Sequence, residues 1–133
     1  MHSYKIELRI VGGELDPETV TRALGLSPSQ IRRKGEKRGA SSTWTKNMWA
    51  FDVLPRSGHD WPQLEDGLTV LVEKFNPVRA KIHSFADSNE VYIWCGHFTS
   101  SFDGGPTLSP VVLSALANFG VQLMLDTYCQ VGT

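Results

Sequence analysis

The chain has 133 residues, the usual size of one domain, and we expect a single α+β domain over residues 1–133. Hydrophobic residues make up 41% of it and charged residues 20%, proportions that fit a globular protein and exclude a disordered one. A formal net charge of −1 gives the whole molecule no field that would attract nucleic acid or an anionic membrane.

The two cysteines, Cys95 and Cys129, fit no zinc-ligand spacing and are too few for a secreted disulfide scaffold. The N-terminus lacks the long apolar run of a signal peptide. No stretch approaches the roughly 18 consecutive apolar residues that span a bilayer. We therefore expect a cytoplasmic protein without a membrane segment.

The start of the chain predicts a strand followed by a helix. Residues 4–11 alternate apolar and polar side chains, which indicates a strand covered on one face only. In the helix, Asp16 suits the N-cap and Pro17 the first helical position, and Gly25 stands where the helix should end.

A second strand and a second helix are expected next. Residues 48–54 predict the strand, with its odd-numbered side chains, Trp49 among them, facing the core. Residues 60–63 have the pattern of a capping box, and apolar residues then recur at helical spacing over 64–75. The Asn76-Pro77 pair predicts the end of that helix.

The remaining elements are a hairpin, a helix and a last strand. Residues 79–85 and 91–99 read as two strands joined by the turn residues 87–89. Residues 110–119 predict a helix. The last strand should cover 121–129, with Val121, Leu123 and Leu125 pointing inward.

The expected order is therefore β-α-β-α-β-β-α-β. An antiparallel or mixed sheet with helices on one face satisfies it, as in a ferredoxin-like sandwich. One sheet face then lies open, and we place on it seven side chains: Glu7, Arg9, Lys81, His83, Trp94, Asp126 and Tyr128. Asp126 stands mid-strand among apolar neighbours and needs a partner, for which Arg9, Lys81 or a backbone amide are the candidates. A structural role for Asp126 is favoured over a catalytic one.

Residues 31–53 stand out in composition, because they hold six of the 13 Lys and Arg residues and two of the four Trp residues. Basic residues with aromatic neighbours can hold a phosphate backbone or dominate a contact between proteins. The candidate partner-binding residues are Arg32, Arg33, Lys34, Lys37, Arg38 and Trp44. The alternative is a solvated loop followed by a core strand.

No residue pattern identifies a reaction. Cys95 and His97 lie two apart on one strand face, with His83 on the neighbouring predicted strand, but zinc sites need three or four clustered ligands. We interpret them as a buried thiol and a structural histidine, and expect no metal. The phosphate-binding and nucleophile-elbow motifs are absent, so we expect no cofactor and assign no catalytic residue.

The order of several features resembles a known family. An IELRI-type first strand precedes Leu15-Asp16-Pro17, and Leu24-Gly25-Leu26, Gly35 in a basic loop, Trp44 and Trp49, and Leu125-Asp126-Thr127-Tyr128 follow. Together they resemble a bacterial family defined only as a domain of unknown function, number four-two-seven-nine. The resemblance covers nearly the whole chain and implies a small α+β domain without an assigned activity.

Three functions are compatible with these features. The first is a non-enzymatic module that binds a protein partner through the basic stretch, in the manner of immunity proteins of bacterial toxin systems, which is an analogy only. The second is a small-ligand or nucleotide-binding enzyme that uses Asp126, His83 and Tyr128 on the open face. The third is binding of single-stranded nucleic acid, which the balanced net charge disfavours. The oligomeric state cannot be inferred.

Overall fold

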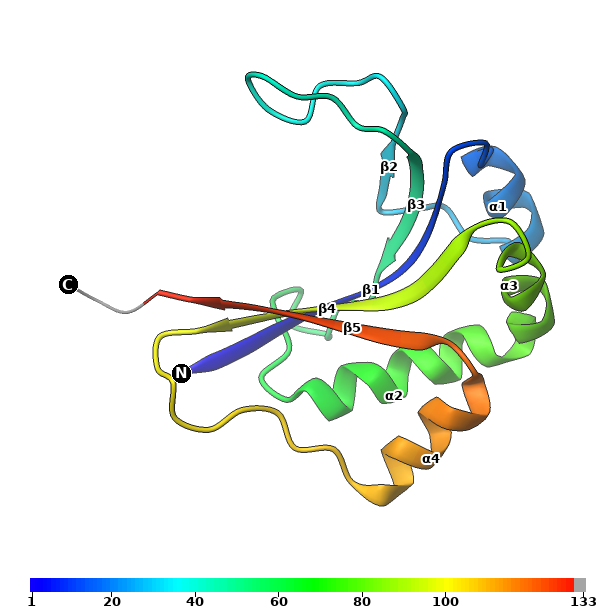
Figure 1. The fold of residues 1–133 in the computed structure, drawn as a ribbon. Coiled ribbons are helices and arrows are strands. Elements are labelled where there is room, and N and C mark those ends of the chain that lie inside the picture. Colours follow the sequence, from blue (N-terminus) through cyan, green and yellow to red (C-terminus); the bar gives the residue numbers. More distant parts are fainter. Residues whose placement is uncertain (131–133) are drawn as a thin grey trace.

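A five-stranded mixed sheet forms the centre of the computed structural model, which describes residues 1–130 (Figure 1). The strand order across the sheet is β2-β3-β1-β4-β5. β1 pairs antiparallel with β3 and β4, β2 pairs antiparallel with β3, and β4 pairs parallel with β5. The strands are β1 His2–Gly12, β2 Gln30–Arg32, β3 Asn47–Asp52, β4 Glu90–Thr99 and β5 Gln122–Cys129.

The helices lie together on one face of the sheet (Figure 1). They are α1 Pro17–Leu24, α2 Leu64–Phe75, the short 3-10 helix η1 Asn76–Val78, α3 Arg79–Phe85 and α4 Pro110–Phe119. The core lies between the two layers, where alternate β1 residues from Tyr4 to Ile10 meet the apolar side of α2. Because side chains alternate across a strand, the other β1 residues face away from the helices. The predicted α+β class with helices on one face is confirmed.

The α1 boundaries agree with the predicted capping residues. The Asp16 carboxylate accepts hydrogen bonds from the Glu18 backbone N–H at 3.1 Å and from the Thr19 hydroxyl at 2.9 Å. These hydrogen bonds lower the pKa of Asp16. Gly25 ends the helix in the left-handed conformation, with φ of 71°, which glycine adopts without a steric penalty.

Residues 79–85 form helix α3, so the predicted strand there and its hairpin with 91–99 are wrong. Within α3 only Ile82 is fully buried, and Phe85, three residues later, also packs on the core. This spacing places both side chains on one side of a helix, although the short alternation in the sequence is also typical of a strand. Pro77 falls in the first turn of η1, where its missing N–H is not needed, so the chain bends there and remains helical.

The ferredoxin-like order is also wrong. The observed order is β-α-β-β-α-α-β-α-β, with η1 joining the two consecutive helices. The short strand β2 was not predicted, and it pairs with β3 so that Ile31 lies opposite Trp49. The last strand β5 joins the sheet parallel to β4, after the crossover through α4.

The predicted capping box at residues 60–63 does not start a helix. α2 begins at Leu64, and Gln63 makes no side-chain cap. Trp61 instead bridges to β1, since its backbone N–H and C=O both bond to Tyr4, at 2.8 and 2.9 Å. The Trp61 indole N–H donates to the Val53 carbonyl at 2.7 Å. Burial of this large side chain therefore overrides the local helical signal.

Strand β5 departs from the expected burial. Leu123 and Leu125 point to the helix side as predicted, yet they are 37% and 42% exposed. Helix α4 packs against α2 and leaves the helix side of β5 largely uncovered (Figure 1). The apolar side chains of β5 are consequently exposed at the edge of the sheet.

The close contact of α2 with the sheet predicts that Gly67→Ala destabilises the protein. A Cβ at Gly67 would clash with Ile6 and lie 2.9 Å from the Trp61 indole, and both side chains are buried. Overpacking costs about 1–3 kcal/mol, which outweighs the gain of about 1 kcal/mol that alanine brings to a helix. Urea denaturation should show a lower free energy of unfolding for Gly67→Ala. Gly13→Ala, where a Cβ meets nothing within 4 Å, is the control, and equal stabilities of the two variants would contradict the packing described.

Candidate functional site: the concave open face and its basic arch

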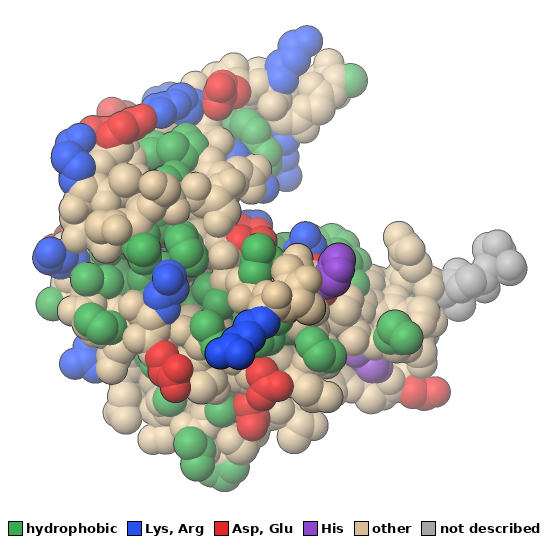
Figure 2. Space-filling view, turned by 180° about the vertical axis from the view of Figure 1, so that it is seen from behind, with side chains coloured by type: hydrophobic (Ala, Val, Ile, Leu, Met, Phe, Trp, Pro, Cys, Tyr) green, Lys and Arg blue, Asp and Glu red, His purple; other side chains and the backbone are tan. Residues whose placement is uncertain are grey.

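The sheet face opposite the helices is concave and stands open (Figure 1). At the β2–β3 edge, residues 33–46 rise from the sheet as an arm, which we call the basic arch. Seen from behind, the arm carries Lys and Arg side chains and stands over a hollow in the molecular surface (Figure 2). The hollow is the candidate site because charged and aromatic side chains from β1, β3 and β4 face it.

A chain of polar contacts crosses the floor of the concave face. The Arg9 guanidinium pairs with Glu7 at 3.0 Å and lies 4.1 Å from the centre of the Trp94 ring. The Trp94 indole N–H in turn donates to the Asp126 carboxylate at 2.7 Å. The partner of Asp126 is therefore an indole, and neither Arg9 nor Lys81. Because the contacts link β1, β4 and β5, they hold the open face without a covering layer.

Gly96 explains how Trp94 lies flat on an uncovered sheet. A Cβ at Gly96 would come within 2.5 Å of the Trp94 ring, so the indole occupies the space that any other side chain would need. Glycine inside a strand commonly marks such a close approach. Trp94 is consequently only 7% exposed, although no helix covers it.

The basic arch is itself an ordered hairpin. Backbone hydrogen bonds of 2.9 Å run from Gly35 N–H to the Trp44 carbonyl, from Trp44 N–H to the Glu36 carbonyl and from Arg38 N–H to the Ser42 carbonyl. Gly35 has φ of 92°, a conformation that favours glycine and allows the chain to turn upward there. The arch thus presents its side chains from a defined backbone.

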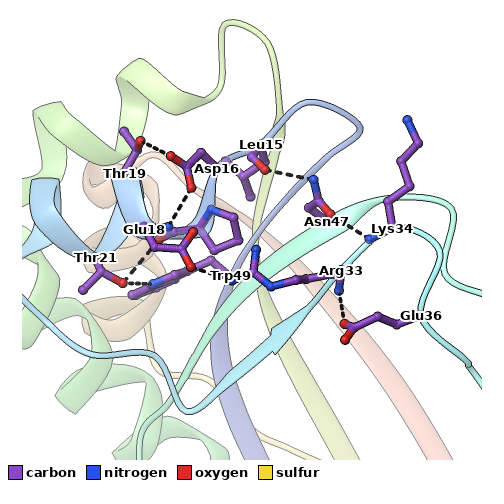
Figure 3. A network of polar contacts seen from close by, with 11 residues as sticks. Leu15, Asp16, Glu18, Thr19, Thr21, Arg33, Lys34, Glu36, Asn47 and Trp49 are labelled. Atoms are coloured by element: carbon purple, nitrogen blue, oxygen red, sulfur yellow. Dashed lines mark hydrogen bonds and ion pairs between the residues drawn. The ribbon is translucent and has the colours of Figure 1, made fainter.

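Two of the predicted partner-binding residues fasten the arch to α1 and its preceding loop (Figure 3). The Arg33 guanidinium forms an ion pair with Glu18, which raises the pKa of Arg33. The Lys34 backbone N–H donates to the Asn47 side-chain oxygen at 2.7 Å, and the Asn47 amide donates to the Leu15 carbonyl at 2.9 Å. Arg33 and Lys34 therefore have contacts inside the protein that account for them.

Two guanidinium groups lie over the Trp44 ring. Arg32 lies 4.0 Å and Arg38 4.7 Å from the centre of the Trp44 ring, both within the range of cation–π attraction. The three side chains border a cavity of about 190 Å³, together with Lys46, Met48 and Tyr92. Neither arginine has a carboxylate partner among residues 1–130. Lys37 stands near the tip of the arch, exposed and away from this cavity.

Two buried side-chain atoms at the concave face, Arg32 Nε and Asp52 Oδ1, have no hydrogen-bond partner within the described residues. Burial, together with the nearby charge of Arg9, lowers the pKa of Arg32. Burial, followed by the charge of Glu7, raises the pKa of Asp52. A buried polar atom without a partner is costly, so a ligand that bonded these groups would gain from their desolvated state.

A larger depression, of about 730 Å³, lies at the end of the sheet between the β1–α1 loop and the α3–β4 turn. Its polar side chains include His83 of α3, Asp87 of the α3–β4 turn and Glu90 at the start of β4, and all three are exposed. Neither Arg32 nor Asp52, the described residues with a buried atom that lacks a hydrogen-bond partner, lines this depression. We therefore take the concave face as the better candidate.

Several predicted site residues are not brought together. Lys81 and His83 lie on α3 in the helix layer, so their predicted place on the open face is wrong. The His83 ring nitrogen contacts the Phe119 carbonyl at 2.8 Å. Tyr128 is on the open face as predicted and stacks on Phe98, with ring centres 5.1 Å apart. Asp126, His83 and Tyr128 consequently do not form one site.

The Cys95–His97 pair also lacks a third ligand within the described residues. Both side chains point to the helix side of β4 and are buried. His97 contacts His2 at 2.8 Å and Thr127 at 3.3 Å, and burial with the neighbouring His2 lowers its pKa. His83, on α3, is a partner of neither residue.

The sequence interpretation missed some residues that line the site. Tyr92 and Met48 border the cavity below the arch, and Asp52 faces the concave surface beside Glu7. Met48 and Asp52 could have been found from the alternation of β3, since they lie opposite in direction to Trp49. The folding back of the arch over Met48 has no signal in the local sequence.

These features define a small α+β domain with helices on one face and a concave, arginine- and tryptophan-bearing surface on the other. The chain matches the family model described as Domain of unknown function (DUF4279) over residues 2–130, and it belongs to that family. Neither the comparison with curated proteins nor that with solved structures gave a match. Within residues 1–130, no helix has the length and apolar character needed to cross a membrane.

The buried position of Cys95 predicts an unreactive thiol. Burial raises its pKa to about 12, so hardly any thiolate forms near pH 8, and the side chain is fully covered. In a Cys129→Ser variant, Ellman's reagent should detect no thiol in the folded protein and one per chain in denaturant. A Cys95→Ser variant reports Cys129 alone for comparison. Rapid reaction of folded Cys129→Ser would contradict the burial of Cys95.

The raised pKa of Asp52 predicts a pH-dependent effect of Asp52→Asn. The folded protein holds the Asp52 proton more tightly than the unfolded chain, so wild-type stability falls as the pH rises from the ordinary value of 3.8 through the raised one. Asn carries no charge and avoids this loss. The free energy of unfolding of Asp52→Asn, relative to that of wild type, should therefore be higher at pH 7 than at pH 3.5.

Urea denaturation at both pH values measures this difference, with Asp87→Asn in the exposed α3–β4 turn as the matched control. A relative free energy of unfolding of Asp52→Asn that is the same at both pH values, or that falls as the pH rises, would contradict the assigned direction.

Proposed function

We propose that this domain is a non-enzymatic module that binds a protein partner on its concave face, and that the partner contributes acidic groups to Arg32 and Arg38. The contact of both guanidiniums with the Trp44 ring, beside a cavity of about 190 Å³, carries the proposal. Arginine and tryptophan are the residue types most enriched among the energetically dominant residues of protein interfaces. Contact with the Trp44 ring restrains both guanidiniums, so less side-chain entropy is lost when a carboxylate binds.

The charge pattern of the concave face favours a protein over a nucleic acid. Arg32, Arg38 and Lys46 surround the cavity, but Glu7 and Asp52 face the same hollow next to it. A phosphate backbone would meet these carboxylates as it crossed the floor, and repulsion would cancel much of its attraction to the arch. A protein surface can offer charges of both signs and match such a pattern.

An enzymatic role has less support. Asp126, the one carboxylate of the proposed enzyme site on the open face, is engaged with the Trp94 indole, and His83 lies in the helix layer. General acid–base catalysis needs its groups within hydrogen-bond reach of one substrate. The analogy with immunity proteins remains part of the proposal. It describes the kind of partner expected, which is an acidic protein bound with defined stoichiometry.

The proposal predicts that Arg38→Glu strongly weakens partner capture. Arg38 is exposed, so the substitution should leave the fold intact while it reverses a charge at the cavity. Lys81→Glu makes the same charge change on exposed α3, in the helix layer, and is the matched control. Losing one charge-assisted contact costs about 1.5–3 kcal/mol, which corresponds to a loss of affinity of roughly tenfold or more.

The measurement is quantitative mass spectrometry of proteins retained from native host lysate by immobilised wild type, Arg38→Glu and Lys81→Glu. We expect one protein at stoichiometric level with wild type and Lys81→Glu and its loss with Arg38→Glu. Three results would refute the proposal: no such protein, equal retention by all three, or recovery of nuclease-sensitive material only.

A further inference from the structure

The two edges of the sheet differ in their protection. The β2 edge is three residues long and ends in Arg32, where the basic arch begins. The β5 edge runs from Gln122 to Cys129 and contains no Pro, Lys or Arg. Short strands, prolines and positive charges are the usual means by which proteins prevent edge-to-edge pairing. β5 has none of these three features.

The free edge of β5 offers a regular set of backbone groups. The Gln130 N–H bonds to the Thr99 carbonyl at 2.9 Å and continues the ladder to β4. In a parallel ladder, alternate residues direct both N–H and C=O to the same neighbour, so the even-numbered residues of β5 bond to β4. The outward-pointing N–H and C=O groups are therefore those of Leu123, Leu125, Thr127 and Cys129.

Apolar side chains flank that edge on both faces of the sheet. Leu123 and Leu125 are 37% and 42% exposed on the helix side, and Met124 and Tyr128 are 39% and 47% exposed on the open face. Leu113 of α4 is 51% exposed. Val111 and Ala115 of α4 border α2. Because an α-helix turns by about 100° per residue, Leu113 lies on the opposite side of α4 and thus toward the β5 edge.

We propose that β5 is a dimerisation strand, which pairs antiparallel with β5 of a second copy of this chain about a two-fold axis. The pairing would satisfy the outward backbone groups and join two sheets into one. It would also cover Leu123 and Leu125 with side chains of the second copy and bring the two Leu113 side chains toward each other. A contact made by the two strands alone would be small. The contribution of Leu113 from α4 enlarges it toward the size of a stable interface.

The charge pattern of β5 selects the register. Asp126 is its single charged residue. A two-fold axis at Asp126 would place two carboxylates directly opposite in a non-hydrogen-bonded pair, the closest type, which is unfavourable. An axis at Leu125 pairs Leu125 with itself, Asp126 with Met124 and Leu123 with Thr127. An axis at Met124 shortens the overlap, so the Leu125-centred register is assigned.

A second copy fits this edge better than an unrelated partner. Strand addition needs a complementary free strand, and within residues 1–130 the sheet edge long enough to supply one is β5 itself. The strand is uncharged apart from Asp126, whose carboxylate is held by the Trp94 indole. The edge therefore provides no charge that would select a foreign strand, whereas it is complementary to its own copy.

The first test is the mass in solution of wild type and Thr127→Pro, measured by light scattering and sedimentation over a micromolar concentration series. Proline at 127 removes an outward N–H that the ladder to β4 does not use, so the monomer should keep its fold. We expect a dimer for wild type and a monomer with unchanged circular dichroism for Thr127→Pro. Thr107→Pro, in an exposed loop, is the control and should remain dimeric.

Leu125→Lys provides a second variant that places a charge at the axis without changing the backbone, and it too should be monomeric. A monomeric wild type, or a dimer that persists in both Thr127→Pro and Leu125→Lys, would overturn the proposal. Arg38→Glu should leave the dimer unchanged, so failure of the partner-binding proposal is separate from failure of this one.

Cysteine cross-linking tests the register in a Cys129→Ser background. In the Leu125-centred pairing, the two Cα atoms at position 125 lie about 5.5 Å apart, within the range of a disulfide. Those at position 123 are separated by about four residues, roughly 13 Å. Under mild oxidation Leu125→Cys should form a covalent dimer and Leu123→Cys should not, and the reverse result would overturn the register.

Discussion

The central strand β1 sets the constraint on which the rest of the structure depends. It is hydrogen-bonded along both sides, to β3 and β4, and only one of its faces is covered by helices. Its outward face must therefore be stabilised by contacts within the sheet itself. Arg9 provides them, since it pairs with Glu7 in the same strand and stacks on Trp94 in the next. The concave surface exists because these contacts replace a second helix layer.

Much of the fold could be predicted from local patterns, and the errors have physical causes. The strand at 4–11 and the helix after Asp16 followed from alternation and capping, which are local properties. The strand predicted for residues 79–85 is wrong because one buried side chain, Ile82, and one partly buried side chain, Phe85, are too few to separate a helix from a strand. At Trp61 a long-range backbone pairing with Tyr4 prevailed over a local capping pattern.

The candidate site was predictable in composition and not in geometry. The density of arginine and tryptophan marked residues 31–53 as unusual, and Trp44 and Arg38 do meet there. The sequence could not show that neighbouring basic residues have different contacts. Arg33 contacts Glu18, fifteen residues earlier in the chain, whereas Arg32 turns toward Trp44. Adjacent residues of a strand point to opposite faces, but the contact that each one finds depends on the tertiary fold.

The basic arch and the exposed strand stand at opposite edges of the same sheet, and this arrangement links the two proposals. Pairing of two β5 strands would join two open faces at the middle and leave an arch at each far end. A dimeric or repetitive partner could then engage both arches at once, and the second contact would form at high effective concentration. Each cavity of about 190 Å³ would need only modest affinity of its own. On this proposal the charged loop at one edge of the sheet contacts the partner, and the exposed strand at the other edge joins the two copies that present it.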